Sequence, residues 1–385
     1  MTAIVARCLF WGGVAGIGYT FIGYRLLLHI LKSRSVAEPS RKMETALPGV
    51  TVVLCARNEE TRITARIENL LATRHPSDLL RVVVVSDGST DGTVNAVSAV
   101  NDERVRVLAL SPPEGKAACV NAGVAASTTE IIVFADARQQ WDAETIPRLV
   151  QGLGDPAVGA VSGALEIRGA ASTTGRGLDR YWGWEKAVRL AESRLDSCIG
   201  CTGAVYAIRR ALYVPIPPNT ILDDVVIPML IAEKGYRVLF EPAARAWDPQ
   251  ALEPAAETRR KTRTLAGNWQ MLGRYPAWLH PGGHRLWWQL LSHKYLRLAT
   301  PIFLCQILVG SLALRREGWC YAAALTLQAI AYSLGTLGLA GSGKGSAVVA
   351  LPAAFLFLNA AIMRSAWHWF RGDRGKLWQG SAETP

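Results

Sequence analysis

The middle of the chain alternates short, continuously apolar runs with segments in which apolar residues recur at helical spacing. Runs of about four to eight residues that are rich in Val and Ile are typical of buried strands. Strands that alternate with helices predict an α/β domain with a mostly parallel sheet covered on both faces. The strands are predicted at Val50–Cys55, Arg81–Val85, Arg104–Ala109 and Glu130–Ala135, and the helices at Thr61–Leu71, Val94–Val100 and Asn121–Ala126.

Longer apolar runs lie near both ends of the chain. Cys8–Tyr24 is uncharged, and its apolar character continues to Leu31. Because about 20 apolar residues span a bilayer as a helix, this run predicts a transmembrane anchor. A cleaved signal peptide is the alternative, but the basic residues follow the run and no clear cleavage motif is present. About three further spans are predicted at Leu298–Leu314, Gly318–Gly343 and Gly345–Met363.

The flanks of these runs indicate how the chain is oriented. Arg285–Arg297 mixes Trp and Leu with basic residues, which is typical of a helix lying in the membrane interface. The positive-inside tendency places the segment after the first span in the cytoplasm. Three crossings from there would put the C-terminus outside, whereas its basic residues favour the inside. Either one run does not cross fully or the tail departs from the charge rule, and the sequence leaves both possibilities open.

The distribution of charge narrows the choice of partners. The formal net charge is +11, yet residues 49–284 hold 26 basic and 26 acidic side chains. The excess lies in residues 1–48, with six basic and two acidic, and in residues 285–385, with ten basic and three acidic. A nucleic-acid-binding domain would carry the excess itself, so this pattern predicts no nucleic acid and indicates membrane lipids instead. We therefore predict an N-terminal anchor with a basic linker (1–48), a cytoplasmic domain (49–284) and a C-terminal membrane region (285–385), at the cytoplasmic (inner) membrane.

The cysteine and histidine residues do not predict a disulfide or a metal site. The seven Cys are scattered, and disulfides are not expected in a cytoplasmic domain. Cys198 and Cys201 form a lone C-x-x-C, which offers too few ligands for zinc. His280 and His284 flank a Pro-Gly-Gly turn, which predicts a surface loop and no metal pair.

Two acidic residues directly follow predicted strands. Asp87 comes after the second strand and Asp136 after the fourth. In open α/β sheets, ligands bind outside the carboxyl ends of the strands, so both side chains are placed for binding. Lys116 follows a flexible Gly and is suited to phosphate oxygens, and Asp136 is suited to a divalent metal. Each residue taken alone has an ordinary structural explanation as a turn former, a helix cap or a surface residue.

The order of these residues within longer motifs resembles a known family. The chain is similar to family 2 glycosyltransferases of the membrane-embedded, polysaccharide-synthase-like kind (cellulose or hyaluronan synthases), which have the GT-A fold. The motifs that carry the resemblance are TVVLCARNEE (51–60), VVVVSDGSTDGT (82–93), EGKAACVNAGVAAS (114–127), IIVFADARQ (131–139), GCTGAVYAIRR (200–210), LDDVVIPMLIAEKGYRVLFEP (222–242) and RRKTRTLAGNWQ (259–270).

The resemblance implies a role for each matching residue. A nucleotide-sugar donor, with UDP expected as the nucleotide, would bind near the first four motifs, and Mg²⁺ or Mn²⁺ would bind at Asp136. Asp224, with Asp223 beside it, would be the catalytic base. The residues implied in donor binding are Asn58, Glu59, Asp87, Lys116, Asp136, Arg260 and Arg263, and those implied near the acceptor are Gly200, Cys201, Thr202, Gly203 and Trp269.

The implied chemistry is consistent with these residue types. Sugar transfer from a nucleoside diphosphate needs a stabilised leaving group, which a metal, Lys116 and Arg263 would supply. It also needs an acceptor hydroxyl that loses a proton to a carboxylate such as Asp224. Direct displacement with a single base would invert the anomeric centre. The acceptor would be a polysaccharide or a lipid-linked glycan, with a possible oligomer or export partner, because four spans are few for a polymer channel.

Three departures from the family pattern stand out. The metal motif, usually D-x-D, reads Asp136-Ala137-Arg138, so its second carboxylate is missing. In the Q-x-x-R-W motif, Arg260 and Thr264 replace Gln and Trp. Arg57 stands where the family commonly has Tyr. These losses leave open a non-catalytic membrane scaffold that binds nucleotide or glycan. A sugar nucleotidyltransferase is a further alternative because it shares the α/β domain, but it would not need the membrane helices.

Overall fold

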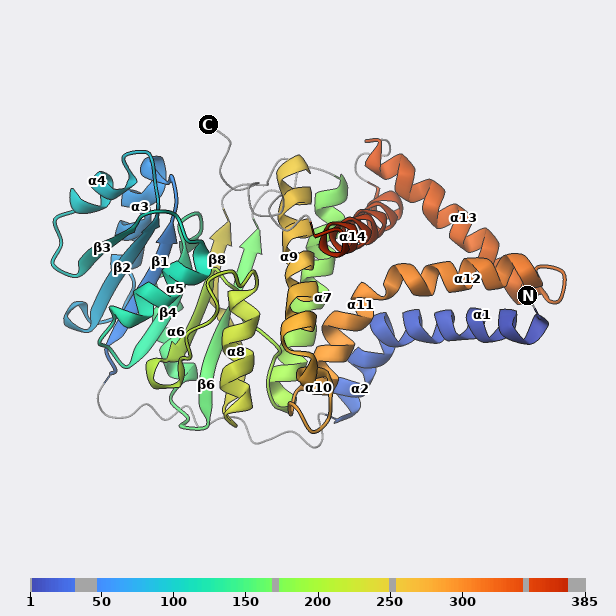
Figure 1. Ribbon diagram of the computed structural model, residues 1–385, viewed down its shortest axis with the longest axis horizontal. Helices are drawn as coiled ribbons and strands as arrows, with labels where there is room; N and C mark the ends of the chain where they lie inside the picture. The colour runs from blue at the N-terminus through green and yellow to red at the C-terminus, as the bar shows by residue number, and fades with distance from the viewer. Residues whose placement is uncertain (1, 32–46, 168–172, 249–253, 342–345, 373–385) are drawn as a thin grey trace. The chain divides into compact units, whose positions relative to one another are not determined.

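The computed structural model describes residues 2–31, 47–167, 173–248, 254–341 and 346–372 (Figure 1). The chain divides into two compact units. Unit 1 comprises Met1–Ser33, Ala170–Glu185 and Ala251–Pro385, and unit 2 comprises Arg34–Gly169 and Lys186–Gln250. Most of the predicted central domain thus belongs to unit 2, while its residues 170–185 and 251–284 group with the terminal segments.

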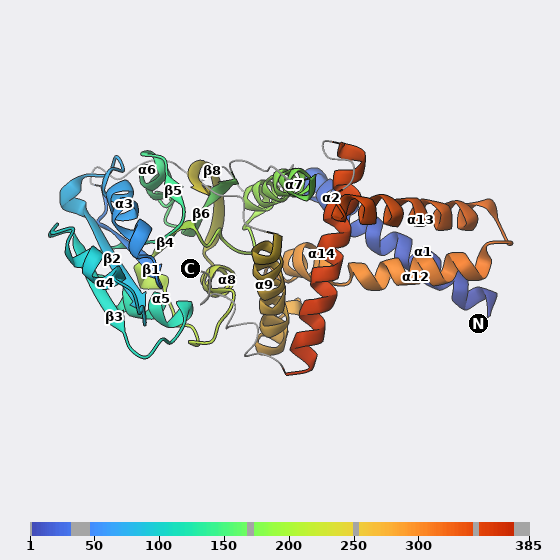
Figure 2. The same ribbon diagram turned by 90° about the horizontal axis from the view of Figure 1, so that it is seen from above.

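Unit 2 is built on one eight-stranded mixed sheet with the order β3-β2-β1-β4-β7-β6-β8-β5 (Figures 1 and 2). Strands β1 to β4 run parallel, as do β6 and β8, whereas β7 is antiparallel to both its neighbours and β5 is antiparallel to β8. The predicted mostly parallel sheet is confirmed. The strands are β1 (Val50–Ala56), β2 (Leu80–Asp87), β3 (Val105–Leu110), β4 (Ile131–Asp136), β5 (Gln140–Trp141), β6 (Val158–Ile167), β7 (Val205–Arg209) and β8 (Arg237–Asp248).

Helices cover both faces of the sheet around β1 and β2, which explains why these two strands are mostly apolar. Alternate residues of β1 and β2 pack on one face against α3, α4 and α6, and the intervening residues Val83 and Val85 pack with Cys119 of α5 on the other. Helix α8 contacts β6 and β8. The bounds are α3 (Glu60–Leu71), η3 (Ser77–Leu79), α4 (Thr93–Ser98), α5 (Lys116–Ala125), α6 (Thr145–Gly152), η4 (Arg210–Leu212) and α8 (Asp223–Glu233).

The register of the central strands aligns their carboxyl ends. Cys55 at the end of β1 pairs with Asp136 of β4, and Ala56 pairs with Ser86 of β2. Because the strands are parallel, the loops that follow β1, β2 and β4 emerge at the same edge of the sheet. Of the predicted donor-binding residues, Asn58, Glu59, Asp87, Lys116 and Asp136 fall at this edge, whereas Arg260 and Arg263 lie on a helix of unit 1.

Unit 1 consists of helices. Among its described residues, three helices are long and apolar enough to cross a membrane, namely Ala3–Leu31, Trp319–Leu339 and Val348–Phe370. A fourth apolar segment bends by 58° between Trp287–Leu298 and Thr300–Leu314. The elements are α1 (Ala3–Gly18), η1 (Tyr19–Gly23), α2 (Tyr24–Leu31), α7 (Thr173–Leu195, its first part), α9 (Pro254–Arg274), η5 (Pro276–Leu279), α10 (Trp287–Leu290), η6 (Leu291–Tyr295), α11 (Leu296–Leu298), α12 (Thr300–Leu314), α13 (Trp319–Leu339) and α14 (Ala347–Phe370).

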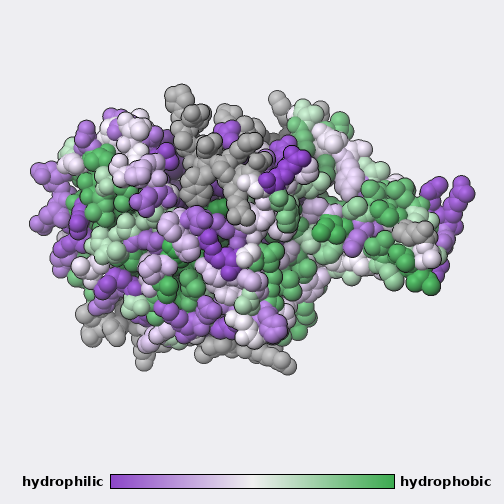
Figure 3. Space-filling model, in the orientation of Figure 1, coloured by the Kyte–Doolittle hydropathy of each residue, from purple (hydrophilic) through white to green (hydrophobic). Residues whose placement is uncertain are grey.

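The apolar helices of unit 1 pack through small residues and leave apolar side chains on their outer surface. A Cβ added to Gly310 of α12 would lie 2.7 Å from Cβ of Phe10 on α1, so glycine allows the two helices to approach closely. Exposed apolar side chains gather over α1, α12 and α13 (Figure 3). Such a surface is what a lipid environment requires. Of the four basic residues that raised the topology conflict, Arg364 and Arg371 are described, whereas Arg374 and Lys376 lie in residues 373–385, outside the described residues.

Candidate active site

Three charged side chains meet at the carboxyl edge of the sheet in unit 2. Lys116 is the first residue of α5, Asp136 ends β4, and Asp223 is the first residue of α8. Nζ of Lys116 lies 2.8 Å from Oδ1 of Asp136 and 3.8 Å from Oδ2 of Asp223. The structure therefore brings together three residues that the sequence motifs singled out separately.

Burial and charge act on this cluster in opposite directions. Burial opposes the charge of Lys116, but the carboxylates of Asp136 and Asp223 outweigh it and raise the lysine pKa above its ordinary value. Burial raises the pKa of Asp223 to about 6, with Asp224 and Asp136 adding to the effect and Lys116 opposing it. The ammonium of Lys116 thus holds together a site with an excess of negative charge.

Asp224 occupies the next position of α8 and is half-buried, whereas Asp223 is buried. Its backbone oxygen accepts a hydrogen bond of 2.7 Å from the amide of Cys201. A Cβ added to Gly203 would lie 3.0 Å from Oδ2 of Asp224. The loop predicted to lie near the acceptor therefore packs directly on the proposed base and leaves its carboxylate room.

The remaining residues of this loop have structural partners. Oγ1 of Thr202 donates to the backbone oxygen of Gly163 at 2.8 Å, and its amide donates to Oγ of Ser162 at 2.9 Å. Cys198 and Cys201 are buried free thiols whose pKa values are raised by burial. Among the described residues, neither thiol belongs to a group of three possible metal ligands.

Asp87 holds the loop that carries Lys116. Its Oδ1 accepts hydrogen bonds from the amides of Glu114, at 2.8 Å, and Gly115, at 2.9 Å. Gly115 has φ +95°, a conformation that favours glycine, and α5 begins directly after it. Asp87 is buried and therefore positions the start of α5. Its direct contact with a base or ribose remains a prediction.

Asn58 and Glu59 link the loops that follow β1 and β2. The amide of Thr90 donates to Oδ1 of Asn58 at 2.9 Å, and the amide of Glu59 donates to Oγ1 of Thr93 at 2.8 Å. Asn58 has φ +53°, which Asn tolerates better than most residues. Burial raises the pKa of Glu59 against the opposing charges of Arg62 and Arg138. The two residues therefore line the same edge of the sheet as the lysine cluster.

Arg66 of α3 is a neighbour of the site that the sequence analysis missed. Its Nε donates to the backbone oxygen of Asp136 at 3.1 Å, and its guanidinium lies 4.7 Å from the ring centre of Trp141. Burial lowers its pKa to about 9, and the charge of Asp136 opposes the shift. The sequence contained a signal for this residue, because Arg66 is a charged residue that falls next to Ile67 on the apolar face of α3.

The site offers few protein ligands for a divalent metal. Enzymes commonly bind Mg²⁺ through one or two carboxylates together with substrate phosphates and water. Asp136 offers one carboxylate, but the place of the second carboxylate of the motif is taken by Arg138, whose Nη2 lies 2.7 Å from Oδ2 of Asp248. Within the described part of the chain, no three His, Cys, Asp or Glu side chains could hold a metal ion together. The residues fit a metal shared with a phosphate-bearing ligand.

Helix α9, which belongs to unit 1, carries three further predicted site residues, Arg260, Arg263 and Trp269. Arg263 is exposed. Nε1 of Trp269 donates to Oγ of Ser365 at 3.2 Å, and its ring centre lies 5.8 Å from that of Phe370. Trp269 therefore packs α9 on α14, and its role near an acceptor, like the donor contacts of the two arginines, remains a prediction.

Comparisons with known proteins identify the kind of domain that carries this site. The family model described as Glycosyl transferase family 2 matches residues 51–213. A probable glycosyltransferase, YdaM of Bacillus subtilis (strain 168), is 26% identical over 247 residues, which is 58% of this chain and 56% of that protein. The poly-beta-1,6-N-acetyl-D-glucosamine synthase of Staphylococcus aureus (strain COL) is 23% identical over 269 residues, which is 68% of this chain and 60% of that protein. The chain thus matches less than two thirds of the length of these relatives.

Among solved structures, the chain is similar to the mannosyltransferase PcManGT from Pyrobaculum calidifontis in complex with GDP-Man and Mn²⁺. The TM-score is 0.73 with 23% sequence identity, and the match covers 96% of this chain and 98% of the other. At this identity the likeness establishes the fold. The chain therefore carries a glycosyl transferase family 2 domain with the GT-A fold.

Proposed function

We propose that this protein is an inverting membrane glycosyltransferase that moves a sugar from a nucleoside diphosphate to a glycan or lipid-linked acceptor. The observation that carries the proposal is the cluster of Lys116, Asp136 and Asp223 at the carboxyl edge of a family 2 domain. Ligands of open α/β sheets bind at this edge. Helix α5 begins at Lys116, so its amino end adds a further preference for negative charge.

Lys116 is proposed to bind the diphosphate and to stabilise the charge that develops on it as the glycosidic bond breaks. A cation fixed before the reaction needs no reorganisation in the transition state. Asp136 and Asp223 hold the ammonium in place within 2.8 Å and 3.8 Å of their carboxylate oxygens. Asp87 supports the same function by holding the loop in front of α5.

Asp224 is proposed to be the general base. It is half-buried beside Gly203, whereas Asp223 is buried and lies near Lys116. The base removes the proton of the acceptor hydroxyl as its oxygen attacks the anomeric carbon and the nucleoside diphosphate leaves from the opposite face. One displacement of this kind inverts the anomeric configuration.

A divalent ion, Mg²⁺ or Mn²⁺, is proposed to bind at Asp136 together with the donor. When bound, such an ion would neutralise part of the diphosphate charge. One carboxylate plus phosphate oxygens is a common arrangement for Mg²⁺. The Mn²⁺ in the mannosyltransferase complex supports a divalent ion as a component of the reaction.

The nucleotide and the sugar are open to test. A UDP-sugar is the expectation from the resemblance, whereas the similar mannosyltransferase was solved with GDP-Man. The name of the staphylococcal relative supports a polymeric acceptor. A donor panel should therefore contain both uridine and guanosine diphosphate sugars, and product size would separate repeated from single transfer.

The apolar helices of unit 1 support a membrane location for the reaction. Three candidate spans and one bent apolar segment surround the catalytic domain in the sequence. We propose that the domain works at the cytoplasmic face of the inner membrane, where lipid-linked acceptors are held. A second copy or an export partner would be needed for a polymer channel if the product is a polysaccharide.

The decisive experiment uses the full chain purified in detergent or nanodiscs with the donor panel and a divalent metal. Wild-type protein should transfer or hydrolyse at least one nucleotide sugar. Asp224→Asn should abolish transfer and leave nucleotide binding intact, while Glu233→Gln, at the exposed end of the same helix, should retain activity. Full activity of Asp224→Asn would rule out this base. No turnover across the panel would favour a nucleotide- or glycan-binding scaffold, which the missing second carboxylate of the metal motif also suggests.

A further inference from the structure

Arg138 stands where the metal motif has its second carboxylate, and a buried carboxylate fixes its side chain there. Its Nη2 lies 2.7 Å from Oδ2 of Asp248, the last residue of β8. The side chain of Asp248 is 3% exposed, and Nε2 of Gln139 donates to the same oxygen at 3.3 Å. A carboxylate this deeply buried requires a cation, so the pair holds the guanidinium in a defined place.

The guanidinium retains capacity for a further ligand. Among the described residues, Nε of Arg138 is buried and has no hydrogen-bond partner. The side chain is nevertheless 24% exposed, so the pair with Asp248 does not enclose it. A buried donor without a partner is costly, and this one lies two residues from Asp136. Its charge also acts on the carboxyl group of Glu59, which belongs to the proposed donor site.

The described residues offer few free ligands for a metal held by the protein alone. Lys116 already lies 2.8 Å from Asp136, Arg138 stands where a second carboxylate would ligate the ion, and no three His, Cys, Asp or Glu side chains of the described residues could hold it together. A diphosphate suits the two cations, because its oxygens match the fork of a guanidinium and accept from an ammonium. Lys116 and Arg138 cannot ligate a metal, but both can therefore bind the donor.

We propose that Arg138 binds the donor diphosphate in the place of the second metal-ligating carboxylate, so that a divalent ion binds only together with the donor. This inference rests on the proposed function. Asp248 is a positioning residue, since it acts by holding the guanidinium. The protein is then expected to bind a nucleoside diphosphate without metal, and not to bind the metal without nucleotide.

The first experiment measures binding of UDP and GDP to the full chain by calorimetry in the presence of EDTA. Wild type should bind one of them, and Arg138→Ala should bind it about tenfold more weakly or worse, the effect of losing a charged hydrogen bond. Wild type and Arg138→Ala should bind the corresponding nucleoside, which lacks the diphosphate, with the same affinity. Arg138→Lys should recover part of the loss, because an ammonium retains the charge without the fork.

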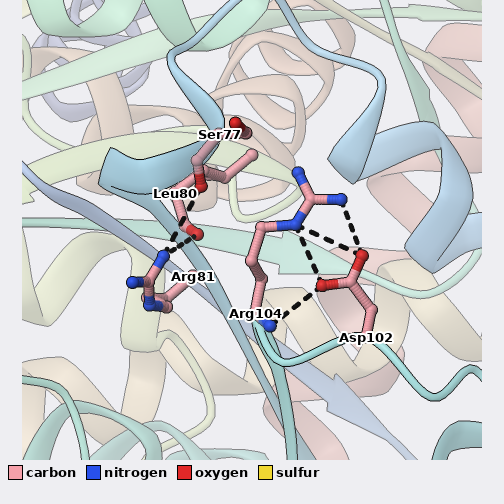
Figure 4. A network of polar contacts seen from close by, with 5 residues as sticks. All are labelled: Ser77, Leu80, Arg81, Asp102 and Arg104. Atoms are coloured by element: carbon pink, nitrogen blue, oxygen red, sulfur yellow. Dashed lines mark hydrogen bonds and ion pairs between the residues drawn. The ribbon is translucent and has the colours of Figure 1, made fainter.

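Two further variants separate this role from a structural one. Arg138→Ala leaves Asp248 buried without its cation, so the double variant with Asp248→Asn removes that penalty and should still bind weakly. Asp248→Asn alone should weaken binding less, and it should add nothing in the absence of Arg138. Arg104→Ala is the matched control, because Arg104 pairs with Asp102 at the opposite edge of the same sheet (Figure 4). It should bind nucleotide like wild type.

The second experiment follows Mn²⁺ directly by the loss of its free-ion EPR signal. Wild-type protein without nucleotide should leave the signal unchanged, and Arg138→Asp, which restores the D-x-D pattern, should reduce it. Equal nucleotide binding by wild type and the folded double variant would overturn the inference, as would Mn²⁺ binding by wild type alone. If wild type bound no nucleotide under any condition, the proposed function itself would fall, and this inference with it.

Discussion

Nζ of Lys116 lies 2.8 Å from Oδ1 of Asp136, although one residue begins a helix and the other ends a strand 20 positions later. The contact joins the two motifs that the sequence suggested for phosphate and for metal. Each charge stabilises the other while no ligand is bound, so the site is assembled before a donor arrives. A diphosphate would then contact a cation that is already in position.

Replacing Lys116 by Ala should lower kcat/KM for the donor by about a hundredfold, which corresponds to about 2.7 kcal/mol of transition-state stabilisation. Lys116→Arg should retain part of the activity because it retains the charge. Lys234→Ala is the control, since that lysine is exposed at the end of α8. Steady-state kinetics with the preferred donor would test this, and activity of Lys116→Ala within a factor of about two of wild type would remove Lys116 from the mechanism.

Asp87 should contribute both to the stability of the loop before α5 and to the affinity for nucleotide. Asp87→Ala removes the acceptor of two backbone amides and should destabilise unit 2 by about 1.5–3 kcal/mol. Asp87→Asn keeps one oxygen acceptor and should lose less. The measurement is thermal unfolding together with nucleotide affinity. A variant with weakened binding and unchanged stability would indicate that Asp87 contacts the nucleotide directly, as the resemblance implies.

Strands β1 to β4 were predicted from the sequence, helped by the burial of β1, β2 and β4 on both faces, whereas β5 to β8 were not predicted. The predicted strand Val50–Cys55 is one residue longer in the structure, at Val50–Ala56, and Arg81–Val85 is three residues longer, at Leu80–Asp87. Helix α5 was predicted too short, at Asn121–Ala126. Its first residues are Lys-Ala-Ala-Cys, which show no amphipathic spacing, and the helix begins after a glycine of positive φ.

The candidate site was predicted as a set of separate residues, and its connections were not. The sequence motifs contain Lys116, Asp136 and Asp223, but only the parallel register of β1 and β4 and the start of α8 bring them together. Arg66 and Asp248 lie outside the family motifs and were missed. They reach the site through tertiary packing, since Asp248 is 110 residues away from its partner Arg138.

Asp223 should make stability depend on pH. Burial raises its pKa in the folded protein to about 6, compared with about 3.9 for an unperturbed Asp. The folded state therefore binds the proton more tightly, and this contribution is fully present below about pH 4 and is lost as the pH rises through about 6. The Tm of wild type should accordingly fall relative to that of Asp223→Asn between these values, with a constant difference above pH 7.

Thermal unfolding of both proteins in the same detergent, at pH steps from about 4 to 8, would measure this difference. Asp142→Asn is a suitable control because that carboxylate is half-buried and accepts a hydrogen bond of 2.6 Å from Nε1 of Trp247, which does not belong to the cluster. A Tm difference between wild type and Asp223→Asn that does not change with pH would show that Asp223 is not protonated in this range.

Gly203 should control the position of the proposed base. A Cβ at this position would lie 3.0 Å from Oδ2 of Asp224, closer than ordinary van der Waals contact. Gly203→Ala should therefore displace the carboxylate by a few tenths of an ångström, and Gly203→Val by more. Because general-base catalysis depends on hydrogen-bond geometry, kcat should fall in that order while nucleotide affinity stays near the wild-type value.

Gly273→Ala provides the matched control, because a Cβ there meets no atom within 4 Å. It should leave both kcat and nucleotide affinity unchanged. If Gly203→Val kept full kcat, the carboxylate of Asp224 would not need its present position, and the base would have to be sought elsewhere. If nucleotide affinity and kcat fell together, the substitution would be acting on the donor site through the packing of α8. Asp224 could then not be assigned to acceptor chemistry separately from donor binding.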